Sequence, residues 1–211
     1  MRLLITAGPT REPIDAVRFI SNRSTGRVGL SLAEAGVAAG HDVTLLLGPG
    51  PGESDVPAGC RVYRFESSAE LKQLLEAHFR DCDVLVMAAA VSDYRPQIVS
   101  EGKLPSDKQA GLVLQLSPTP DLVAMMASMK RAGQQVVAFA LEESAGMEAK
   151  AREKLRRKGV DAIVANPLGT MEASAISAVW LTAAGEREQP GRMSKAEFGP
   201  WLIGKIQTLR G

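Results

Sequence analysis

The stretch that decides the fold reads TAGPTREPIDAVRFISNRSTGRVG and runs from Thr6 to Gly29. A short apolar run precedes it, and a segment with helical spacing follows it. In a plain dinucleotide-binding fold, a short glycine-rich turn joins the first strand to the first helix. Here a long polar insertion with four arginines takes the place of that turn. Long connections inside compact domains are usually functional, so the insertion predicts a ligand-binding loop.

Outward from this stretch, short β-like runs alternate with helical runs. The expected strands are residues 3–6, 42–47, 61–65, 83–91, 112–116, 135–141, 161–166 and 178–182. The expected helices are residues 26–39, 68–79 with Ser68 as the N-cap, 121–131, 146–158 and 194–209. This alternation predicts an α/β fold whose sheet is doubly wound, mainly parallel and Rossmann-like.

The length of 211 residues suits one domain, so residues 1–211 are expected to form a single unit. Residues 92–116 interrupt the regular pattern with polar residues, prolines and glycines. We predict that they form a flap that is mobile without ligand. Residues 112–116 alternate like a half-buried strand and are the expected exception, ordered and able to pair across a dimer.

Composition excludes several classes of protein. The net charge of +1 gives no sign of nucleic acid or an anionic membrane as partner. No apolar run approaches the roughly 20 residues of a membrane span. Cys60 and Cys82 have neither metal-site nor CxxC spacing and are typical of reduced thiols, so we expect a cytoplasmic protein without a signal peptide. His41 and His78 are isolated and are assigned no role, and the sequence leaves the metal ligands open.

In a doubly wound sheet, ligands bind outside the carboxyl ends of the strands. Besides the opening insertion, the segments at those ends are Ser92-Asp93-Tyr94-Arg95, Glu142-Glu143 and Ala165-Asn166-Pro167. We expect them to converge on one crevice.

Ser24-Thr25-Gly26 stands directly before a predicted helix, where backbone amides and hydroxyls form an anion site. Arg11, Arg18, Arg23 and Arg27 add positive charge for phosphate or carboxylate. The alternative is that Ser24 and Thr25 only cap the helix. The GxGxxG and GxxxxGK[ST] motifs are absent, which argues against ordinary NAD binding and against a P-loop.

Other residues near these strand ends have a structural as well as a functional interpretation. Lys103 is a lone loop lysine, and Lys154 and Lys158 lie one helical turn apart, so all three could be solvated charges. Asp93 could cap a turn, and Phe139 could be a core residue. The residues alone therefore predict a protein that binds a phosphorylated ligand, such as a nucleotide, and they indicate no reaction type.

Taken together, several segments resemble the phosphopantothenate–cysteine ligases of coenzyme A biosynthesis, and the resemblance covers nearly the whole chain. Ser21 to Gly26 reads SNRSTG and resembles the family's SNxSSG, and Ala88 to Arg95 reads AAAVSDYR and is similar to AAVAD(W/Y)R. Lys103 stands where the family begins a KxKK flap. Pro120-Asp121-Leu122 resembles NPDI, Phe139-Ala140-Leu141-Glu142 resembles GFAAE, and Val164-Ala165-Asn166 resembles (A/V)AN.

The resemblance implies a two-step reaction. The carboxylate of 4′-phosphopantothenate attacks the α-phosphate of CTP, and pyrophosphate leaves. The amine of L-cysteine then attacks the acyl-cytidylate, giving phosphopantothenoylcysteine and CMP. The resemblance also implies Mg²⁺ with CTP, a homodimer whose flap covers a shared site, and no flavin. Because the chain begins at its first strand, a stand-alone ligase is expected, with a separate phosphopantothenoylcysteine decarboxylase as a candidate partner.

The resemblance assigns roles residue by residue. The expected catalytic residues are Asn22, Lys103 and Arg18. The expected phosphopantothenate-binding residues are Ser24, Gly26, Gly29 and Asn166. The expected nucleotide-binding residues are Met87, Ala88, Ala89, Asp93, Lys103, Pro120, Asp121, Leu122, Phe139, Lys154 and Lys158.

The sequence departs from the family pattern in the flap. It reads Lys103-Leu104-Pro105-Ser106, so the lysine pair that ends KxKK is missing, and Lys108 is a partial replacement. Two alternatives stay open: an NAD(P)-binding oxidoreductase of Rossmann type, and a non-catalytic relative that binds nucleotide or phosphopantothenate. Pyrophosphate release that depends on both cysteine and phosphopantothenate would separate the three.

Overall fold

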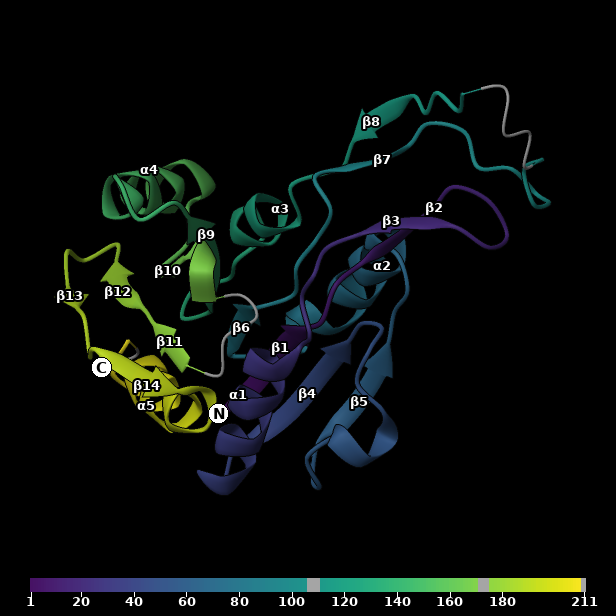
Figure 1. Cartoon of the computed structure of the whole chain (residues 1–211). Helices are drawn as coiled ribbons and strands as arrows, with labels where there is room; N and C mark the ends of the chain where they lie inside the picture. Colours follow the sequence, from purple (N-terminus) through teal and green to yellow (C-terminus); the bar gives the residue numbers. More distant parts are fainter. Residues whose placement is uncertain (106–110, 171–174, 210–211) are drawn as a thin grey trace.

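The computed structural model describes residues 1–105, 111–170 and 175–209. Its centre is an eight-stranded sheet with helices on both faces (Figure 1). The strand order is β13-β12-β10-β9-β6-β1-β4-β5. The strands are β1 (Arg2–Ala7), β4 (Asp42–Leu47), β5 (Arg61–Arg64), β6 (Val84–Met87), β9 (Gln135–Glu142), β10 (Ala162–Pro167), β12 (Val179–Thr182) and β13 (Arg187–Glu188).

The strands from β5 to β10 pair in parallel, and β12 and β13 extend that sheet antiparallel. Strand β1 lies in the interior of the sheet, where Leu3 is opposite Val43 of β4 on one side and Val84 of β6 on the other. The chain order of the strands therefore reverses between β1 and β6, and such a switch point is where doubly wound sheets bind ligands. The predicted α/β, Rossmann-like class is confirmed.

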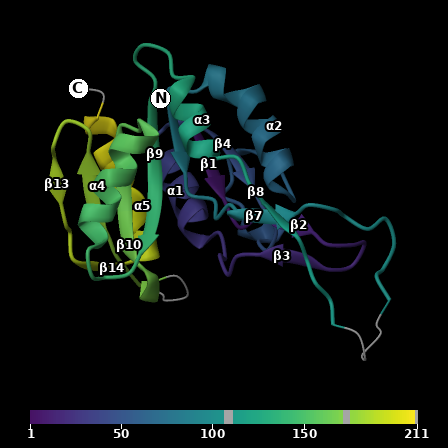
Figure 2. The same ribbon diagram turned by 90° about the horizontal axis from the view of Figure 1, so that it is seen from above.

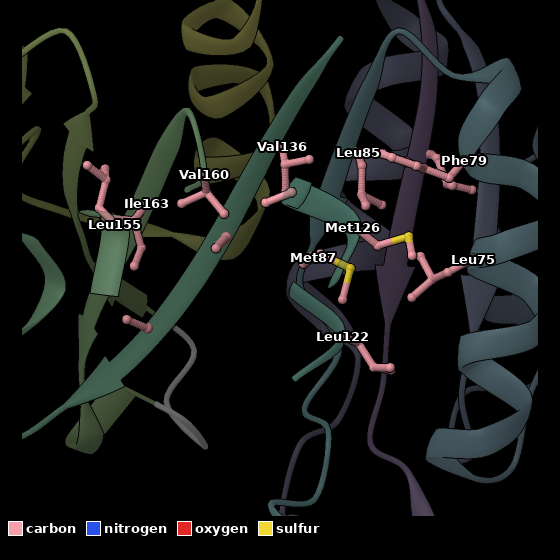
Figure 3. Packing of buried hydrophobic residues seen from close by; sticks show 14 of the residues in the cluster. Leu75, Phe79, Leu85, Met87, Leu122, Met126, Val136, Leu155, Val160 and Ile163 are labelled. Carbon is pink, nitrogen blue, oxygen red and sulfur yellow. The ribbon is translucent and has the colours of Figure 1, made fainter. Parts of the chain in front are cut away.

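Helices α1 (Arg27–Ala38) and α5 (Lys195–Thr208) cover one face of the sheet. Helices α2 (Ser68–His78), α3 (Leu122–Ser128) and α4 (Met147–Lys158) cover the other. Figure 3 shows this second layer, with Leu75 and Met126 packed toward Leu85 and Met87 of β6. Short 3₁₀ turns lie at Glu53–Asp55, Phe79–Asp81 and Leu168–Thr170.

An extended arm projects from the body at the carboxyl side of the sheet (Figures 1 and 2). We define the arm as residues 11–21, 94–105 and 111–118. It contains a hairpin of β2 (Arg11–Pro13) and β3 (Phe19–Ser21) and a ladder of β7 (Tyr94–Pro96) and β8 (Leu116–Pro118). Its two halves leave the sheet after β1 and β6, on either side of the switch point.

A buried carboxylate joins the two halves of the arm. Asp15 accepts hydrogen bonds from the backbone amides of Val17 (2.8 Å), Arg18 (2.7 Å) and Leu104 (3.0 Å), and it pairs with the Arg18 guanidinium. The guanidinium also donates to the Leu104 carbonyl at 2.9 Å. The hydrogen bond from Arg18 holds the pKa of the Asp15 carboxyl well below its usual range. We call this group of contacts the Asp15 clasp.

Some predicted elements were wrong in extent. Residues 112–115 form no strand, and Leu112 and Val113 are exposed, because no sheet face in the described chain lies beneath them. The strand expected at 83–91 ends at Met87, because the following alanines turn away from the ladder and form the wall of a cleft. Helix α2 is capped by Ser67 rather than Ser68, since Ser67 accepts from the Glu70 amide.

Helix α3 is shorter than the predicted 121–131, because Asp121 is its cap and the helix ends at Ser128. The hairpin β2–β3 and the small pair formed by β11 (Ala175–Ser177) and β14 (Arg192–Ser194) were not predicted. Each of these strands is only three residues long, so their pairing leaves little apolar alternation in the sequence. Lys108 lies outside the described residues.

Candidate active site

A cleft with a volume of about 660 Å³ opens at the carboxyl ends of the central strands. Clefts of a few hundred Å³ at a switch point are typical of small-molecule sites. Its lining comes from the opening insertion, the β6–β7 connection, the start of α3, the end of β9, α4, the end of β10 and the start of α5. The predicted convergence of strand-end segments holds for the opening insertion, Ser92-Asp93 and Asn166, whereas Glu142 and Glu143 do not line the cleft.

Hydrogen bonds fasten the two loops at the floor of the cleft. The amide of Thr10 donates to the Ala90 carbonyl at 3.1 Å, and the Ala90 amide donates to the Gly8 carbonyl at 2.9 Å. The amide of Ser92 donates to the Thr10 hydroxyl at 3.1 Å. Asn22 Nδ2 donates to the same Ala90 carbonyl at 3.0 Å, which fixes its side chain at the rim. The loops after β1 and β6 thus form one hydrogen-bonded unit.

Helix α1 begins inside the cleft. Its N-cap, Gly26, has a φ of 73°, a left-handed conformation that favours glycine. Gly29 faces the end of β1, where a Cβ would come within 2.4 Å of the Ala7 Cβ. These two glycines let the helix start close to the sheet, so the backbone amides of its first turn lie at the cleft wall.

On the face covered by α3 and α4, two lysines of α4 line the cleft and contact acidic residues. Lys154 Nζ lies 2.5 Å from Glu142 Oε1, and Lys158 Nζ lies 3.0 Å from Asp121 Oδ1. Asp121 also caps α3 by accepting from the Ala124 amide at 3.1 Å. Although burial opposes the change, this amide and Lys158 lower the pKa of the Asp121 carboxyl.

On the face covered by α1 and α5, the cleft is lined by Phe139, Asn166, Arg27 and Lys195. The phenyl ring of Phe139 is half-buried and lies edge-on to Phe198 of α5, with ring centroids 6.3 Å apart. Asn166 is 8% exposed, and its Oδ1 has no hydrogen-bond partner among the described residues. Its amide therefore retains hydrogen-bonding capacity that a ligand could satisfy.

Most of the predicted site residues line this one cleft. They are Asn22, Ser24, Gly26, Gly29, Met87, Ala88, Ala89, Asp93, Pro120, Asp121, Leu122, Phe139, Lys154, Lys158 and Asn166. The structure does not bring Arg18 or Lys103 to it. Arg18 belongs to the Asp15 clasp, and Lys103 is exposed on the arm beside Leu104.

Sequence reasoning missed Lys195 and Arg157, which also line the cleft. Lys195 is the first residue of the last helix, in a segment that carries none of the motifs. Lys195 could have been found only from its place at the start of a helix on the same sheet face as the opening insertion. Recognising that face requires the strand order, which the sequence alone does not show. Arg157 is one of many charged residues in α4, so nothing in the sequence distinguishes it from its neighbours.

Residues 1–105, 111–170 and 175–209 contain neither a metal-binding cluster nor a membrane-spanning helix. No group of three or more His, Cys, Asp or Glu side chains in these ranges is arranged to hold a metal ion. A helix long and apolar enough to span a membrane is likewise not found there.

The family comparison matches residues 1–209 to the model described as "DNA/pantothenate metabolism flavoprotein C-terminal domain". The curated protein named "Coenzyme A biosynthesis bifunctional protein CoaBC" from Vibrio vulnificus is 36% identical over 218 residues, which cover 99% of this chain and 52% of that protein. A protein named "Cysteine/Cysteine sulfinic acid decarboxylase", from an unknown prokaryotic organism, is 44% identical over 170 residues, 79% of this chain and 46% of that protein. The chain thus spans about half the length of these relatives.

Among solved structures, the C-terminal domain of a CoaBC protein superposes with a TM-score of 0.84. It is 32% identical in sequence, and the match covers 99% of this chain and 94% of that one. The match therefore includes the arm as well as the sheet. The family resemblance drawn from the motifs is confirmed, and the chain belongs to the family of DNA/pantothenate metabolism flavoprotein C-terminal domains.

Proposed function

We propose that this protein joins 4′-phosphopantothenate to L-cysteine at the expense of CTP, through an acyl-cytidylate. The observation that carries the proposal is the convergence of five separate ligase-like segments, together with Lys154 and Lys158, on one cleft at the switch point of the sheet. The coenzyme A biosynthesis named for the CoaBC relatives supports the same class of chemistry. The reaction activates a carboxylate and then forms an amide bond.

The cleft fits such a reaction because it offers positive charge and fixed hydrogen-bond donors. Joining two anionic substrates depends on positioning and charge neutralisation more than on a covalent enzyme intermediate. We assign Lys154 and Lys158 to the triphosphate, which would replace Glu142 and Asp121 as their partners. Ser24, Gly26 and Gly29, at the start of α1, are assigned to phosphopantothenate, together with the amide of Asn166.

We assign the base-binding position to the backbone of Met87, Ala88 and Ala89 and to Asp93, with Pro120, Leu122 and Phe139 beside them. A carboxylate accepts from an exocyclic amino group, and a wrong base leaves buried polar groups unpaired. Cytosine and adenine both carry such an amino group, so Asp93 suits either base, and the preference for CTP over ATP is proposed from the resemblance of Ala88 to Arg95 to the AAVAD(W/Y)R segment of the ligases. Mg²⁺ is proposed to arrive with the nucleotide, as a hard cation bound chiefly by phosphate oxygens.

Arg18 and Lys103 do not reach the cleft of their own chain, so their catalytic roles require a second copy. Nine of the twelve exposed large hydrophobic side chains of the described chain are on the arm. They are Val17, Phe19, Tyr94, Ile98, Val99, Leu112, Val113, Leu114 and Leu116. Apolar groups gathered in this way mark interaction surfaces. We propose a homodimer in which the arm covers the partner's cleft and brings Lys103 to it.

The test is pyrophosphate release with each substrate omitted in turn. We expect release with CTP only when 4′-phosphopantothenate is present, and turnover only when cysteine is added. A larger kcat/KM with ATP would contradict the CTP assignment alone. Binding of NAD(P)H without pyrophosphate release would favour the oxidoreductase alternative, and nucleotide binding without turnover would favour a non-catalytic relative.

Three further proposals concern the protein's surroundings and cofactors. They are a cytoplasmic location, the absence of a flavin site in this chain, and association with a separate phosphopantothenoylcysteine decarboxylase. Co-purification from the native source, with flavin absorbance measured on the isolated chain, would check the last two.

A further inference from the structure

Two cationic side chains face the cleft from the side of the sheet opposite Lys154 and Lys158. Arg27 is the first residue of α1, and Lys195 is the first residue of α5. Residues 27 and 195 are far apart in sequence, so only the packing of α5 against α1 brings them to one wall of the cleft.

Three contacts fix the start of α5 at that wall. The hydroxyl of Ser31, early in α1, donates to the carbonyl of Lys195 at 2.5 Å. Gly199 allows the two helices to approach closely, because a Cβ there would lie 2.5 Å from the Ser31 carbonyl oxygen. Ser194 and Glu197 form a capping box that sets the first turn of α5. Lys195 is therefore held by its backbone, independently of where its ammonium group points.

The environment of Lys195 is unfavourable for a second positive charge. Burial, and next the neighbouring Arg27 guanidinium, lower the pKa of the Lys195 ammonium. Two like charges at a cleft wall repel each other, and an anion between them would remove that cost. Asn166, more than nine-tenths buried and with an unpaired Oδ1, lines the same side of the cleft. The two cations thus point to an anionic group at this wall, and Asn166 Oδ1, which can only accept, suits an N–H or O–H donor elsewhere on the same ligand.

We propose that Lys195 and Arg27 bind the phosphate monoester of the acyl substrate, so that this phosphate and the triphosphate of the nucleotide lie against opposite faces of the sheet. The inference rests on the proposed function and adds two residues to it. A phosphate monoester carries a charge of about −1.5 to −2 at pH 7, which matches one lysine and one arginine. The cations of the opposite face, Lys154 and Lys158 with Arg157, are left for the triphosphate.

Calorimetry with two ligands tests the proposal: 4′-phosphopantothenate, and pantothenate without the phosphate. Lys195→Met keeps the aliphatic stem and removes the charge. We expect it to weaken binding of the phosphorylated ligand by about tenfold or more, the usual range for one charge-assisted hydrogen bond, and to leave pantothenate binding unchanged. Arg27→Gln should act in the same direction, and Lys195→Arg should restore most of the affinity.

Two comparisons make the result specific. Lys154→Met should weaken CTP binding and spare 4′-phosphopantothenate, the reverse of Lys195→Met. Lys72→Met, on the outer surface of α2, should change neither affinity. Unchanged binding of 4′-phosphopantothenate to Lys195→Met, an equal loss for both pantothenate forms, or no binding to the wild type would overturn the proposal. Phosphate-dependent binding without pyrophosphate release would instead support this site and contradict the ligase function.

Discussion

Asn22 and Lys103 occupy different environments, and the difference bears on which half of the proposed reaction each serves. Asn22 is fixed at the cleft by its bond to the Ala90 carbonyl, and it is neutral. Lys103 is a cationic residue exposed on the arm, and it does not line the cleft of its own chain. A charge can offset the negative charge that grows on departing pyrophosphate, whereas an amide can orient an acyl oxygen.

We therefore expect an asymmetric effect of two substitutions. Lys103→Gln should abolish formation of the acyl-cytidylate. Asn22→Asp should still form it but turn it over slowly, because the added negative charge lies beside the carbonyl that cysteine attacks. Rapid quench with labelled nucleotide, first without and then with cysteine, measures both steps. Wild-type levels of intermediate in Lys103→Gln, or none in Asn22→Asp, would reverse the assignment.

Gly29 shows how strongly one residue constrains the start of α1. Its missing Cβ would lie 2.4 Å from the Ala7 Cβ and 3.0 Å from the Ala7 Cα. Gly29→Ala should lower the free energy of unfolding by about 1–3 kcal/mol, as overpacking usually does. Gly204→Ala is the matched control, because that glycine is exposed in α5 with nothing within 4 Å of an added Cβ.

For Gly204→Ala we expect a neutral or slightly stabilising effect, since alanine is the better helix former. Urea denaturation of both variants gives the comparison. Equal stabilities for Gly29→Ala and the wild type would show that α1 can shift away from β1 without cost.

At the scale of elements, the arm depends on its internal polar contacts because it has little core of its own. Glu12, at the base of the hairpin, is buried and accepts from the amide and hydroxyl of Ser68, both at 3.0 Å. Farther out, the Asp15 clasp joins the hairpin to Leu104, and the Ser100 amide donates to the Ile14 carbonyl at 3.1 Å. The segment before residue 106 is therefore tied to the hairpin in several places.

The clasp predicts a pH dependence of stability. Arg18 lowers the pKa of Asp15 in the folded protein, so the contribution of Asp15 is fully present above its unfolded pKa of about 3.9. This contribution to stability is lost as the pH falls through the lower pKa that Asp15 has in the folded protein. Thermal unfolding should show that Asp15→Asn is less stable than the wild type at pH 7. The melting temperatures of the two proteins should converge toward pH 2.

Glu34→Gln removes an exposed carboxylate of α1 and serves as the control for that series. It should follow the wild-type curve throughout. A difference between Asp15→Asn and wild type that stays constant from pH 7 to pH 2 would mean that Asp15 acts through packing alone.

The elements that the sequence predicted well share one property: each buries an apolar face that leaves a period in the sequence. Strands β1, β4, β9 and β10 and helices α1, α2, α4 and α5 are of this kind. Hairpin β2–β3 and ladder β7–β8 have no such face, so their pairing depends on side chains such as Asp15 whose partners are distant in sequence. The alternation at residues 112–116 was misleading because its apolar side chains face outward.

At the scale of the whole molecule, the proposed dimer makes catalytic activity depend on the arm as well as on the cleft. Val113 is 88% exposed and Ile98 is 77% exposed. Val113→Asp combined with Ile98→Asp should weaken the dimer, because burying an unpaired charge costs on the order of 3 kcal/mol or more. The dissociation constant should rise roughly a hundredfold or more.

Analytical ultracentrifugation over a concentration series measures that constant, and pyrophosphate release should fall in parallel. Met129→Asp is the control, since Met129 is an exposed hydrophobic residue at the end of α3, away from the arm. A monomeric wild type, or a double variant that dimerises normally, would refute this arrangement.

The site was predictable from the sequence wherever a motif follows a strand, because the carboxyl ends of parallel strands share one edge. That is why Asn22, Asp93, Phe139 and Asn166 all line the cleft. Lys195 was not predictable, since its place depends on how α5 packs on α1. The positions of Arg18 and Lys103 depend on the arm, whose geometry no local pattern encodes.

Lys154 and Lys158 carry a further consequence through their bonds to Glu142 and Asp121. These carboxylates belong to the same chain, so they compete with any incoming anion as intramolecular inhibitors. Tethered groups of this kind act at effective concentrations of millimolar or above. A lone phosphate or sulfate ion makes too few contacts to displace both, whereas a triphosphate engages both lysines at once. Glu142 and Asp121 would thus make the cleft selective. Polyvalent ligands could displace them from the lysines, whereas the monovalent and divalent anions of the cell could not.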